Sequence, residues 1–451
     1  MASASVAGGE VIAPKLMTDA TRLLWGSDIK HDVFRRWTQG FVFSSDEPSA
    51  LLQHQGGPCA VIVPVQAFLL KNLLFRNTPS DKWRHVSEKQ QRMLLCRALE
   101  DILHALVHSD SFLLVSHHPD TYNGGDDGND VDLGDDSGGG TSSPKKQCSS
   151  HEQFHLGLRC HRCNSRDELS NKLQSLLEMY VGQYGILLLL YSIILTKGVD
   201  HIKNEVEDPN EALIDGIHGH GSQSLINLLI TGRAVSNVWD NDKYISGLKL
   251  QGVNGQAQVG FLTLLEHMRY CEVGWYLKNP CYPIWVLGSE THLTVLFSQE
   301  QNLVMSETPE AAARRLFNTY DTEGSGFIAG DMLGDLMASL NLVSDEEYVK
   351  IMREKMDPEE LGIITLNGFM DEFFPSEAQS EAVQSFTVFH YNGLPSSGPG
   401  HKVMYVEGTA VIMEMPELQI ITDSSSIKMC LLTKWPTIEL KWKDNFIPSL
   451  N

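Results

Sequence analysis

A cysteine stands behind a Gly-Gly-Pro entrance in the segment QGGPCAVIVPVQAFLL, residues 55–70. Gly56 and Gly57 allow the backbone to bend and another chain to approach closely. Pro58 is favoured at the first position of a helix, which would put Cys59 in the first turn. Unpaired N–H groups and the helix dipole stabilise a thiolate there. The segment predicts a cysteine nucleophile, and a small buried core cysteine is the alternative.

A cysteine nucleophile needs a base and donors for the developing oxyanion. Gln53 lies six residues before Cys59, the arrangement of papain-type enzymes, in which the glutamine amide faces the oxyanion and the histidine lies far downstream on a strand. Among 17 histidines, His292 opens a predicted strand after small residues. His390 and His401 also lie on or near predicted strands, but the setting of His292 is more open. We predict the set Gln53, Cys59 and His292.

Two other motifs suggest metal chemistry. HEQFH, residues 151–155, matches the zinc-protease pattern, and CHRC, residues 160–163, has the spacing of a zinc or redox pair. No third-ligand motif follows the first, and no second cysteine pair completes the second. We therefore expect no metal site and no cofactor.

Two segments resemble EF-hand loops. DTEGSGFIAGDM, residues 321–332, has acidic or polar residues at positions 1, 3 and 5 and glycine at position 6. Its twelfth position is Met332, where calcium binding requires a bidentate glutamate. DPEELGIITLNG, residues 357–368, keeps the glycine but has Leu361 and Gly368 at positions 5 and 12. We expect a degenerate EF-hand-like pair that serves as a scaffold or docking module.

Hydrophobic periodicity predicts the elements that would position these residues. Helices are expected up to about residue 116, then over about 152–198 and 222–230. YGILLLLYSIIL, residues 184–195, is too short to span a bilayer and reads as a helix buried on all sides. Strands are expected from residue 283 in PIWVLG and HLTVLFS, and later in FTVFHYNG, HKVMYVEGTAVIME, KMCLLTKW and TIELKW.

The pattern predicts an α+β fold with a papain-like arrangement, in which a helical part carries the nucleophile and a β-sheet carries the histidine. A catalytic domain is expected to begin at residues 10–308 and to be completed by a β segment at residues 384–447. The EF-hand-like helical pair, residues 309–376, would be inserted between them. Residues 118–150 are rich in Gly, Asp and Ser and predict a disordered acidic loop.

Charge and cysteine content limit the class of protein. The chain has 57 acidic and 35 basic residues and a net charge of −22, which disfavours binding to nucleic acid or to a membrane surface. Eight cysteines in 451 residues are too few for a disulfide scaffold. The N-terminus shows no secretory signal. We expect an intracellular protein, nuclear or cytoplasmic or both, whose thiols stay free.

The blocks QGGPCAVIVPVQAFLLK, HGSQSLINLLITGRAVSNVWD, PIWVLGSETHLTVLF and TKWPTIELKW resemble the MINDY family of deubiquitinating cysteine proteases, most of all its third member. The resemblance covers about residues 24–451. It implies that Cys59 is the nucleophile, that His292 is the general base and that Gln53 contributes to the oxyanion hole. It also implies cleavage of ubiquitin from conjugates, with lysine-48-linked chains as the preferred substrate and partner.

Other roles remain open at this stage. Gly57 would help to form a narrow tunnel for the Gly-Gly tail of ubiquitin. Trp239, in TGRAVSNVWD, either lines the groove for that tail or packs in the core. Glu290 and Asn302 are the candidates for the group that orients His292. The alternative function is a non-catalytic interaction protein that works through the EF-hand-type pair, and a zinc peptidase ranks third.

Overall fold

The structure is a computed structural model that describes residues 8–76, 82–107, 110–118, 150–245, 247–304, 309–321, 325–375, 385–412 and 425–451. The chain forms two compact units, one of residues 1–301 and 385–451 and one of residues 302–384. The predicted acidic loop of residues 118–150 lies outside the described residues except at its two ends. The predicted domain boundaries and the roles of the segments stay predictions.

A six-stranded sheet forms one side of the first unit. Its order is β15-β14-β13-β10-β9-β8, with bounds Ile438–Trp442, Tyr405–Ile412, Ser385–Tyr391, Leu293–Phe297, Ile284–Gly288 and Gly260–Thr263. All neighbours are antiparallel except β8 and β9, which are parallel. Strands β10 and β13 pair with Leu296 opposite His390, although these two residues are 94 positions apart in the sequence. The second unit therefore lies, in sequence, between two neighbouring strands.

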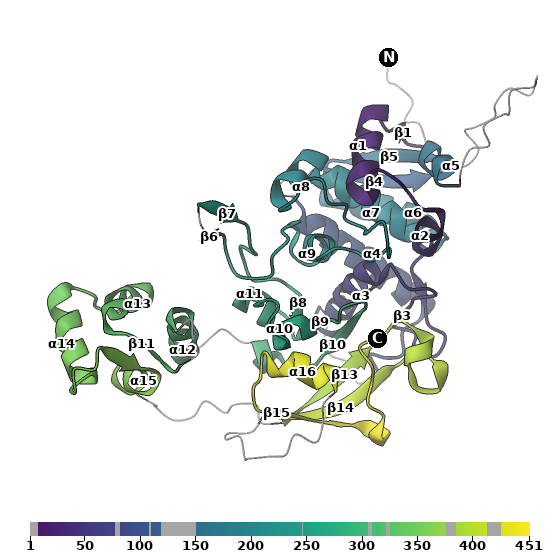
Figure 1. The fold of residues 1–451 in the computed structure, drawn as a ribbon. Coiled ribbons are helices and arrows are strands. Elements are labelled where there is room, and N and C mark those ends of the chain that lie inside the picture. Colours follow the sequence, from purple (N-terminus) through teal and green to yellow (C-terminus); the bar gives the residue numbers. More distant parts are fainter. Residues whose placement is uncertain are drawn as a thin grey trace, which may run out of the picture. The chain divides into compact units, whose positions relative to one another are not determined.

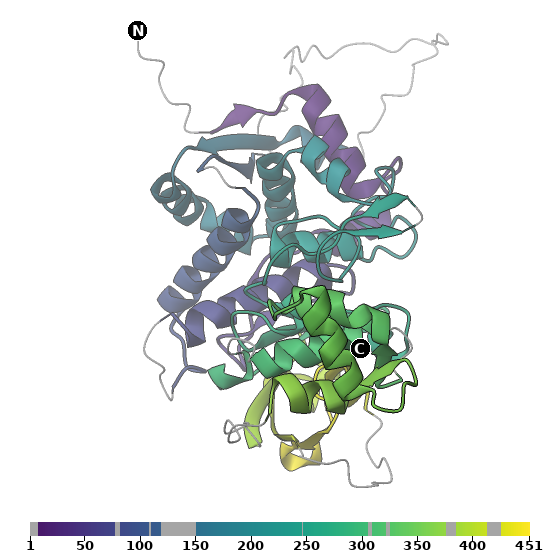
Figure 2. The same cartoon turned by 90° about the vertical axis from the view of Figure 1, so that its left-hand side faces the viewer.

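Helix α3 (Cys59–Leu74) packs against β9 and β10. Every residue of α3 except Leu73 is buried, because the helix has apolar side chains all round and other elements cover every face. Helices coloured purple to teal surround α3, and the yellow C-terminal strands lie at the end of this unit opposite to α1 (Figure 1, Figure 2). The nucleophile candidate thus begins a helix at the boundary between helices and sheet.

The other helices of this unit are α1 (Pro14–Trp25), α2 (His31–Trp37), α4 (Glu88–Ala105), α5 (Ser150–Leu156), α6 (Arg166–Val181), α7 (Gly185–Lys197), α8 (Val199–Glu205), α9 (Gln223–Thr231), α10 (Leu264–His267), α11 (Trp275–Lys278) and α16 (Ser426–Leu432). The buried helix predicted from YGILLLLYSIIL is confirmed as α7, whose residues from Gly185 to Leu195 are all buried. Among the described residues, no single helix is long and apolar enough to cross a bilayer; α7 and α8 reach that length only together, across a bend of 85°.

Three predictions of secondary structure are wrong. The helix expected over residues 152–198 is interrupted, because residues 158–163 form strand β5. The residues before Ser116 are not all helical, because FLLVSH forms β4 (Phe112–His117), which pairs with β5 (Leu158–Cys163) and through it with β1 (Glu10–Val11). KMCLLTKW is not a strand but lies largely in α16. The Ser425 hydroxyl accepts from the Lys428 amide and caps this helix, and its buried side chains recur at helical spacing.

Two small hairpins complete the first unit. Strands β2 (Val42–Phe43) and β3 (Leu51–Leu52) pair, as do β6 (Lys243–Ile245) and β7 (Leu248–Leu250). The first hairpin matters for the site because β3 ends directly before Gln53.

The second unit has its own apolar core. It comprises α12 (Pro309–Tyr320), β11 (Phe327–Ala329), α13 (Leu333–Ser339), α14 (Glu346–Met356), β12 (Ile363–Thr365) and α15 (Leu366–Phe373). Strands β11 and β12 pair antiparallel, with Ile328 opposite Ile364. Both of these side chains are buried in the core of the unit. The two loops with the EF-hand-like pattern therefore meet at their short strands.

Candidate active site

Cys59 is the first residue of α3. Gly57 before it has φ +125°, a conformation that side chains disfavour, and Pro58 is the N-cap. The Cys59 thiol donates to the Gly57 carbonyl oxygen at 3.8 Å. Burial raises the pKa of this thiol to about 11, although the backbone N–H groups of Leu293 and Ala60 favour its thiolate form. The thiol is therefore protonated at neutral pH in this closed arrangement.

His292 directly precedes β10, and the next residue along the chain touches the nucleophile candidate. The Leu293 amide lies near the Cys59 sulfur and favours its thiolate form. Burial lowers the pKa of His292, while its hydrogen bond with Asn392 opposes that shift. The imidazole is therefore neutral at pH 7, which is the state that a general base requires.

Asn392 holds the ring of His292. Its Oδ1 lies 3.0 Å from His292 Nε2 and also accepts the Leu394 amide at 3.0 Å. Its Nδ2 donates to the Ser449 carbonyl at 3.2 Å. These partners fix which end of the amide faces the ring. Since an amide oxygen only accepts, Nε2 carries the proton in neutral His292, and Nδ1 is the basic nitrogen.

Sequence reasoning missed this orienting residue. The predicted candidates were Glu290 and Asn302, and both are exposed. The hydrogen-bond partner of His292 Nε2 is instead Asn392. Asn392 follows β13, whose residue Tyr391 pairs with Val295 in β10. In the sequence, the sign of this role is a polar residue, Asn392, at the end of the predicted strand FTVFHYNG. It identifies the partner of His292 only once the pairing of the two strands is known.

Gln53 reaches the same region from β3. It is fully buried, and its amide N–H donates to the Gly393 carbonyl at 2.8 Å, next to Asn392. Its side-chain Nε2 donates to the Gln55 carbonyl at 2.9 Å. Its Oε1 is buried without a hydrogen-bond partner among the residues that the structure describes. Buried polar atoms normally have a hydrogen-bond partner, so this oxygen is open to a further donor.

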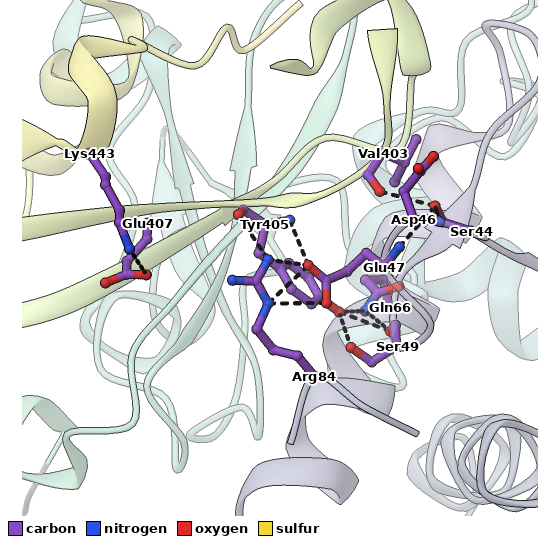
Figure 3. A network of polar contacts seen from close by, with 10 residues as sticks. All are labelled: Ser44, Asp46, Glu47, Ser49, Gln66, Arg84, Val403, Tyr405, Glu407 and Lys443. Carbon is purple, nitrogen blue, oxygen red and sulfur yellow. Dashed lines mark hydrogen bonds and ion pairs between the residues drawn. The ribbon is translucent and has the colours of Figure 1, made fainter. Parts of the chain in front are cut away.

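A polar network fixes the segment that carries Gln53 against α3 and β14 (Figure 3). Gln66 on α3 accepts the Leu51 amide at 2.6 Å and donates to the Ser49 carbonyl at 3.0 Å. The same Gln66 amide donates to the Tyr405 hydroxyl at 3.0 Å. Because one side chain ties β3 to α3 and to β14, Gln53 and Cys59 keep a fixed separation.

An ion pair extends this network. Both Arg84 Nε and Arg84 Nη2 donate to the carboxylate of Glu47, and Nη2 also donates to the Tyr405 carbonyl at 3.3 Å (Figure 3). The Glu47 side chain is 3% exposed and that of Arg84 is 30% exposed. A bidentate pair of this kind gives orientation as well as energy, so the start of β14 is held in register with residues 44–49.

A glycine-rich loop, residues 215–221, covers the start of α3. Trp37 Nε1 donates to the Gly219 carbonyl at 3.0 Å, and a Cβ at Gly57 would lie 3.3 Å from both of these groups. His220 in this loop lies within electrostatic range of His292. Cys59 is 5% exposed and His292 is 6% exposed, so both side chains are almost completely covered in this structure.

The two predicted substrate-binding residues, Gly57 and Trp239, lie in different surroundings. Gly57 lies beside the thiol, under the cover formed by Trp37 and Gly219. Trp239 is half-buried, with Lys243 Nζ 4.9 Å from its ring centroid and Gly252 packed against it. Both alternatives for Trp239 stay predictions.

The metal motifs do not form a common site. Within the described ranges, no group of three or more His, Cys, Asp or Glu side chains is arranged to hold a metal ion. His155 on α5 is hydrogen-bonded to the Tyr191 hydroxyl at 2.6 Å. Cys160 and Cys163 are three positions apart on β5, so their side chains point to opposite faces of the strand.

Comparison with known proteins supports the family suggested by the sequence. The model of the conserved domain of the deubiquitinating enzyme MINDY-3/4 matches residues 21–324. The human ubiquitin carboxyl-terminal hydrolase MINDY-3 is 50% identical over 450 residues, covering 97% of this chain and 100% of the human protein. The Drosophila melanogaster MINDY-3 homolog is 42% identical, covering 96% of this chain and 83% of its own.

A more distant relative is the probable ubiquitin carboxyl-terminal hydrolase MINDY-4 of mouse, which is 32% identical over 282 residues, covering 61% of this chain and 35% of the relative. No solved structure matches the chain. The family match covers more than half of the chain and includes the segments that carry Gln53, Cys59 and His292. The chain belongs to the family of MINDY-3/4 deubiquitinating enzymes.

Proposed function

We propose that this chain removes lysine-48-linked ubiquitin from conjugates by nucleophilic attack of the Cys59 thiolate. One observation carries the proposal: the Leu293 amide contacts the Cys59 sulfur, and the adjacent His292 is oriented by Asn392. A buried cysteine of the core alone requires no oriented histidine beside it. The helix that begins at Cys59 and the strand that follows His292 support a papain-like arrangement.

In the proposed reaction, Nδ1 of His292 takes the proton of the Cys59 thiol. The sulfur then attacks the isopeptide carbonyl carbon, and His292 returns the proton to the departing lysine amine. The product is a thioester between Cys59 and the ubiquitin C-terminus. Water, deprotonated by His292, hydrolyses this thioester and restores the thiol. Asn392 keeps the imidazole in the tautomer that both steps need.

Gln53 is the proposed side-chain donor to the oxyanion. Its Nε2 now donates to the Gln55 carbonyl, and its Oε1 is unsatisfied. Turning the amide toward the substrate would exchange this internal bond for one to the developing negative charge. Such donors contribute mainly in the transition state. The buried thiol with its raised pKa supports a free enzyme that becomes active only when substrate rearranges the site.

The test is reaction with ubiquitin that bears an electrophile at its C-terminus, read by intact mass. Wild type and Cys281→Ala, which removes an exposed free cysteine, should gain the mass of one ubiquitin, while Cys59→Ala should gain none. Incubation with chains of lysine-48, lysine-63 and lysine-11 linkage then tests the preference. A Cys59→Ala protein that cleaves chains at the wild-type rate would refute the mechanism.

We also propose that the second unit is a degenerate EF-hand pair that does not depend on calcium. Its loops pair through Ile328 and Ile364. The Asp321 carboxylate accepts the amides of Ser325 and Gly326, at 2.9 and 2.6 Å. The carboxylate at residue 357 makes the equivalent bonds to residues 361 and 362. The loops are thus closed by their own amides, which supports a scaffold.

A further inference from the structure

A groove between α4 and α6 is lined by cations in a strongly acidic protein. Arg76, at the end of α3, and Lys89, Arg92 and Arg97 on α4 line a cavity of about 900 Å³. The chain as a whole has a net charge of −22. A volume of this size matches sites for small organic ligands rather than for a single ion.

One guanidinium nitrogen in this groove has no partner. Nη1 of Arg97 is buried and makes no hydrogen bond within the part of the chain that the structure describes. A buried charged donor without an acceptor is costly, and native proteins seldom keep one without a reason. The nitrogen is therefore available to an acceptor supplied by a ligand.

Two neighbouring cations, Arg76 and Lys89, are also only weakly paired. Arg76 donates to the Asn72 side chain at 3.4 Å, and among the described residues neither Arg76 nor Lys89 forms an ion pair. Arg92 pairs with Glu178 on α6 at the edge of the groove. Arg76, Lys89 and Arg97 can thus turn toward one ligand.

The groove also contains carboxylates, and they determine which anion fits. Glu88 and Glu100 line it together with the cations, and Glu100 is hydrogen-bonded to the Ser170 hydroxyl. A ligand with a single carboxylate would bring only one more group of the kind that Glu88 and Glu100 already present to the cations. A phosphate chain carries more charge and more acceptor oxygens in a small volume, and the arginine fork binds such oxygens in pairs.

We propose that the groove between α4 and α6 binds a small molecule that carries a chain of two or three phosphates, with Arg76, Lys89 and Arg97 as its ligands. The net charge of −22 disfavours a polymeric acid such as a nucleic acid. Met93 and Leu177 give the groove an apolar wall that a base or ring of the same ligand would contact. Free polyphosphate and a nucleotide share the proposed chemistry.

The test is isothermal titration calorimetry of the full chain with inorganic tripolyphosphate and, separately, with ATP, both without magnesium and at low salt. We expect one saturable site whose affinity falls as salt rises. Arg97→Gln and Arg76→Gln should each weaken binding by about tenfold or more, the loss expected for a charge-assisted hydrogen bond. Arg166→Gln, which removes a 71% exposed arginine outside the groove, should bind as wild type.

The two probes distinguish a nucleotide from a phosphate chain alone. Tighter binding of ATP than of tripolyphosphate assigns a nucleotide, and equal binding assigns the phosphate chain alone. Because Arg76 is exposed, Arg76→Gln keeps the test valid even where Arg97→Gln impairs folding. Absence of saturable heat with both probes, unchanged affinity in Arg76→Gln, or tighter binding of a hexaglutamate peptide would overturn the proposal.

Discussion

The side-chain oxygen of Asn392 lies 3.0 Å from Nε2 of His292, and its amide nitrogen is held by the carbonyl of Ser449. Three segments that are far apart in the sequence therefore determine one histidine tautomer. In the reaction proposed above, this tautomer leaves Nδ1 free to accept the proton of the nucleophile.

Replacement of Asn392 by Ala should lower kcat on ubiquitin chains by about ten- to a hundredfold, because a misoriented base costs rate rather than binding. KM should change little. The matched control is Asn302→Ala, which removes an exposed asparagine that does not contact Nε2 of His292. Equal kcat for wild type and Asn392→Ala would show that the hydrogen bond does not orient the base.

Alkylation of Cys59 should follow its raised pKa. Burial raises this pKa to about 11, so the reactive thiolate forms only as the pH rises toward that value. In free protein, the rate of iodoacetamide labelling at Cys59, located by peptide mass spectrometry, should therefore still increase between pH 8 and pH 10. A rate that is already at its plateau at pH 7 would mean that the thiol is ionised in the free enzyme.

The cover over the site should be loosened by Trp37→Phe. This change replaces the indole by a smaller aromatic ring and removes the N–H group that donates to the Gly219 carbonyl. Local opening should become more frequent, and labelling of Cys59 at pH 8 should accelerate about three- to tenfold, as expected for the loss of one buried hydrogen bond. Labelling of the exposed Cys281 in the same sample serves as the internal control.

The pair of Glu47 and Arg84 should contribute to stability. Glu47→Gln leaves a partly buried guanidinium with a weaker partner, and the free energy of unfolding should fall by about 2–3 kcal/mol. The control is Glu407→Gln, whose partner Lys443 is 64% exposed, and we expect a change of less than about 0.5 kcal/mol there. Urea titrations followed by tryptophan fluorescence measure both, and equal values for the two variants would contradict the difference in burial.

The second unit should be insensitive to calcium. Titration of the full chain with millimolar calcium should give no binding heat, because the twelfth loop positions are Met332 and Gly368. Asp321→Ala should nevertheless lower the melting temperature of this unit, since the carboxylate closes its loop by accepting two amides. Saturable calcium heat that disappears in Asp321→Ala would instead indicate a functional calcium site.

Local patterns in the sequence predicted part of this arrangement. The glycines and proline before Cys59, and the strand after His292, are signals carried by neighbouring residues, and the structure has a helix that begins at Cys59 and a strand that begins at Leu293. The roles of Gln53, Cys59 and His292 stay predictions. The α+β class followed from the change in hydrophobic period, and the structure confirms it.

Other features depend on pairing that the sequence does not reveal. The contact of Asn392 with His292 arises from the register between β10 and β13, which a whole unit separates in sequence. The FLLVSH segment forms β4 because β5 lies beside it, whereas a short apolar run alone fits helix and strand equally. The closed cover over Cys59 likewise depends on contacts between distant segments.

The order of the strands has a consequence for biosynthesis. On the ribosome, Cys59 and His292 emerge long before Asn392 and Ser449, which together hold the imidazole. Domains fold as units once their contacts are available, so the nascent chain lacks an oriented His292 imidazole until residue 449 has been translated. A chain that is released before residue 392, for example by premature termination, would thus contain Cys59 without the contact that orients His292.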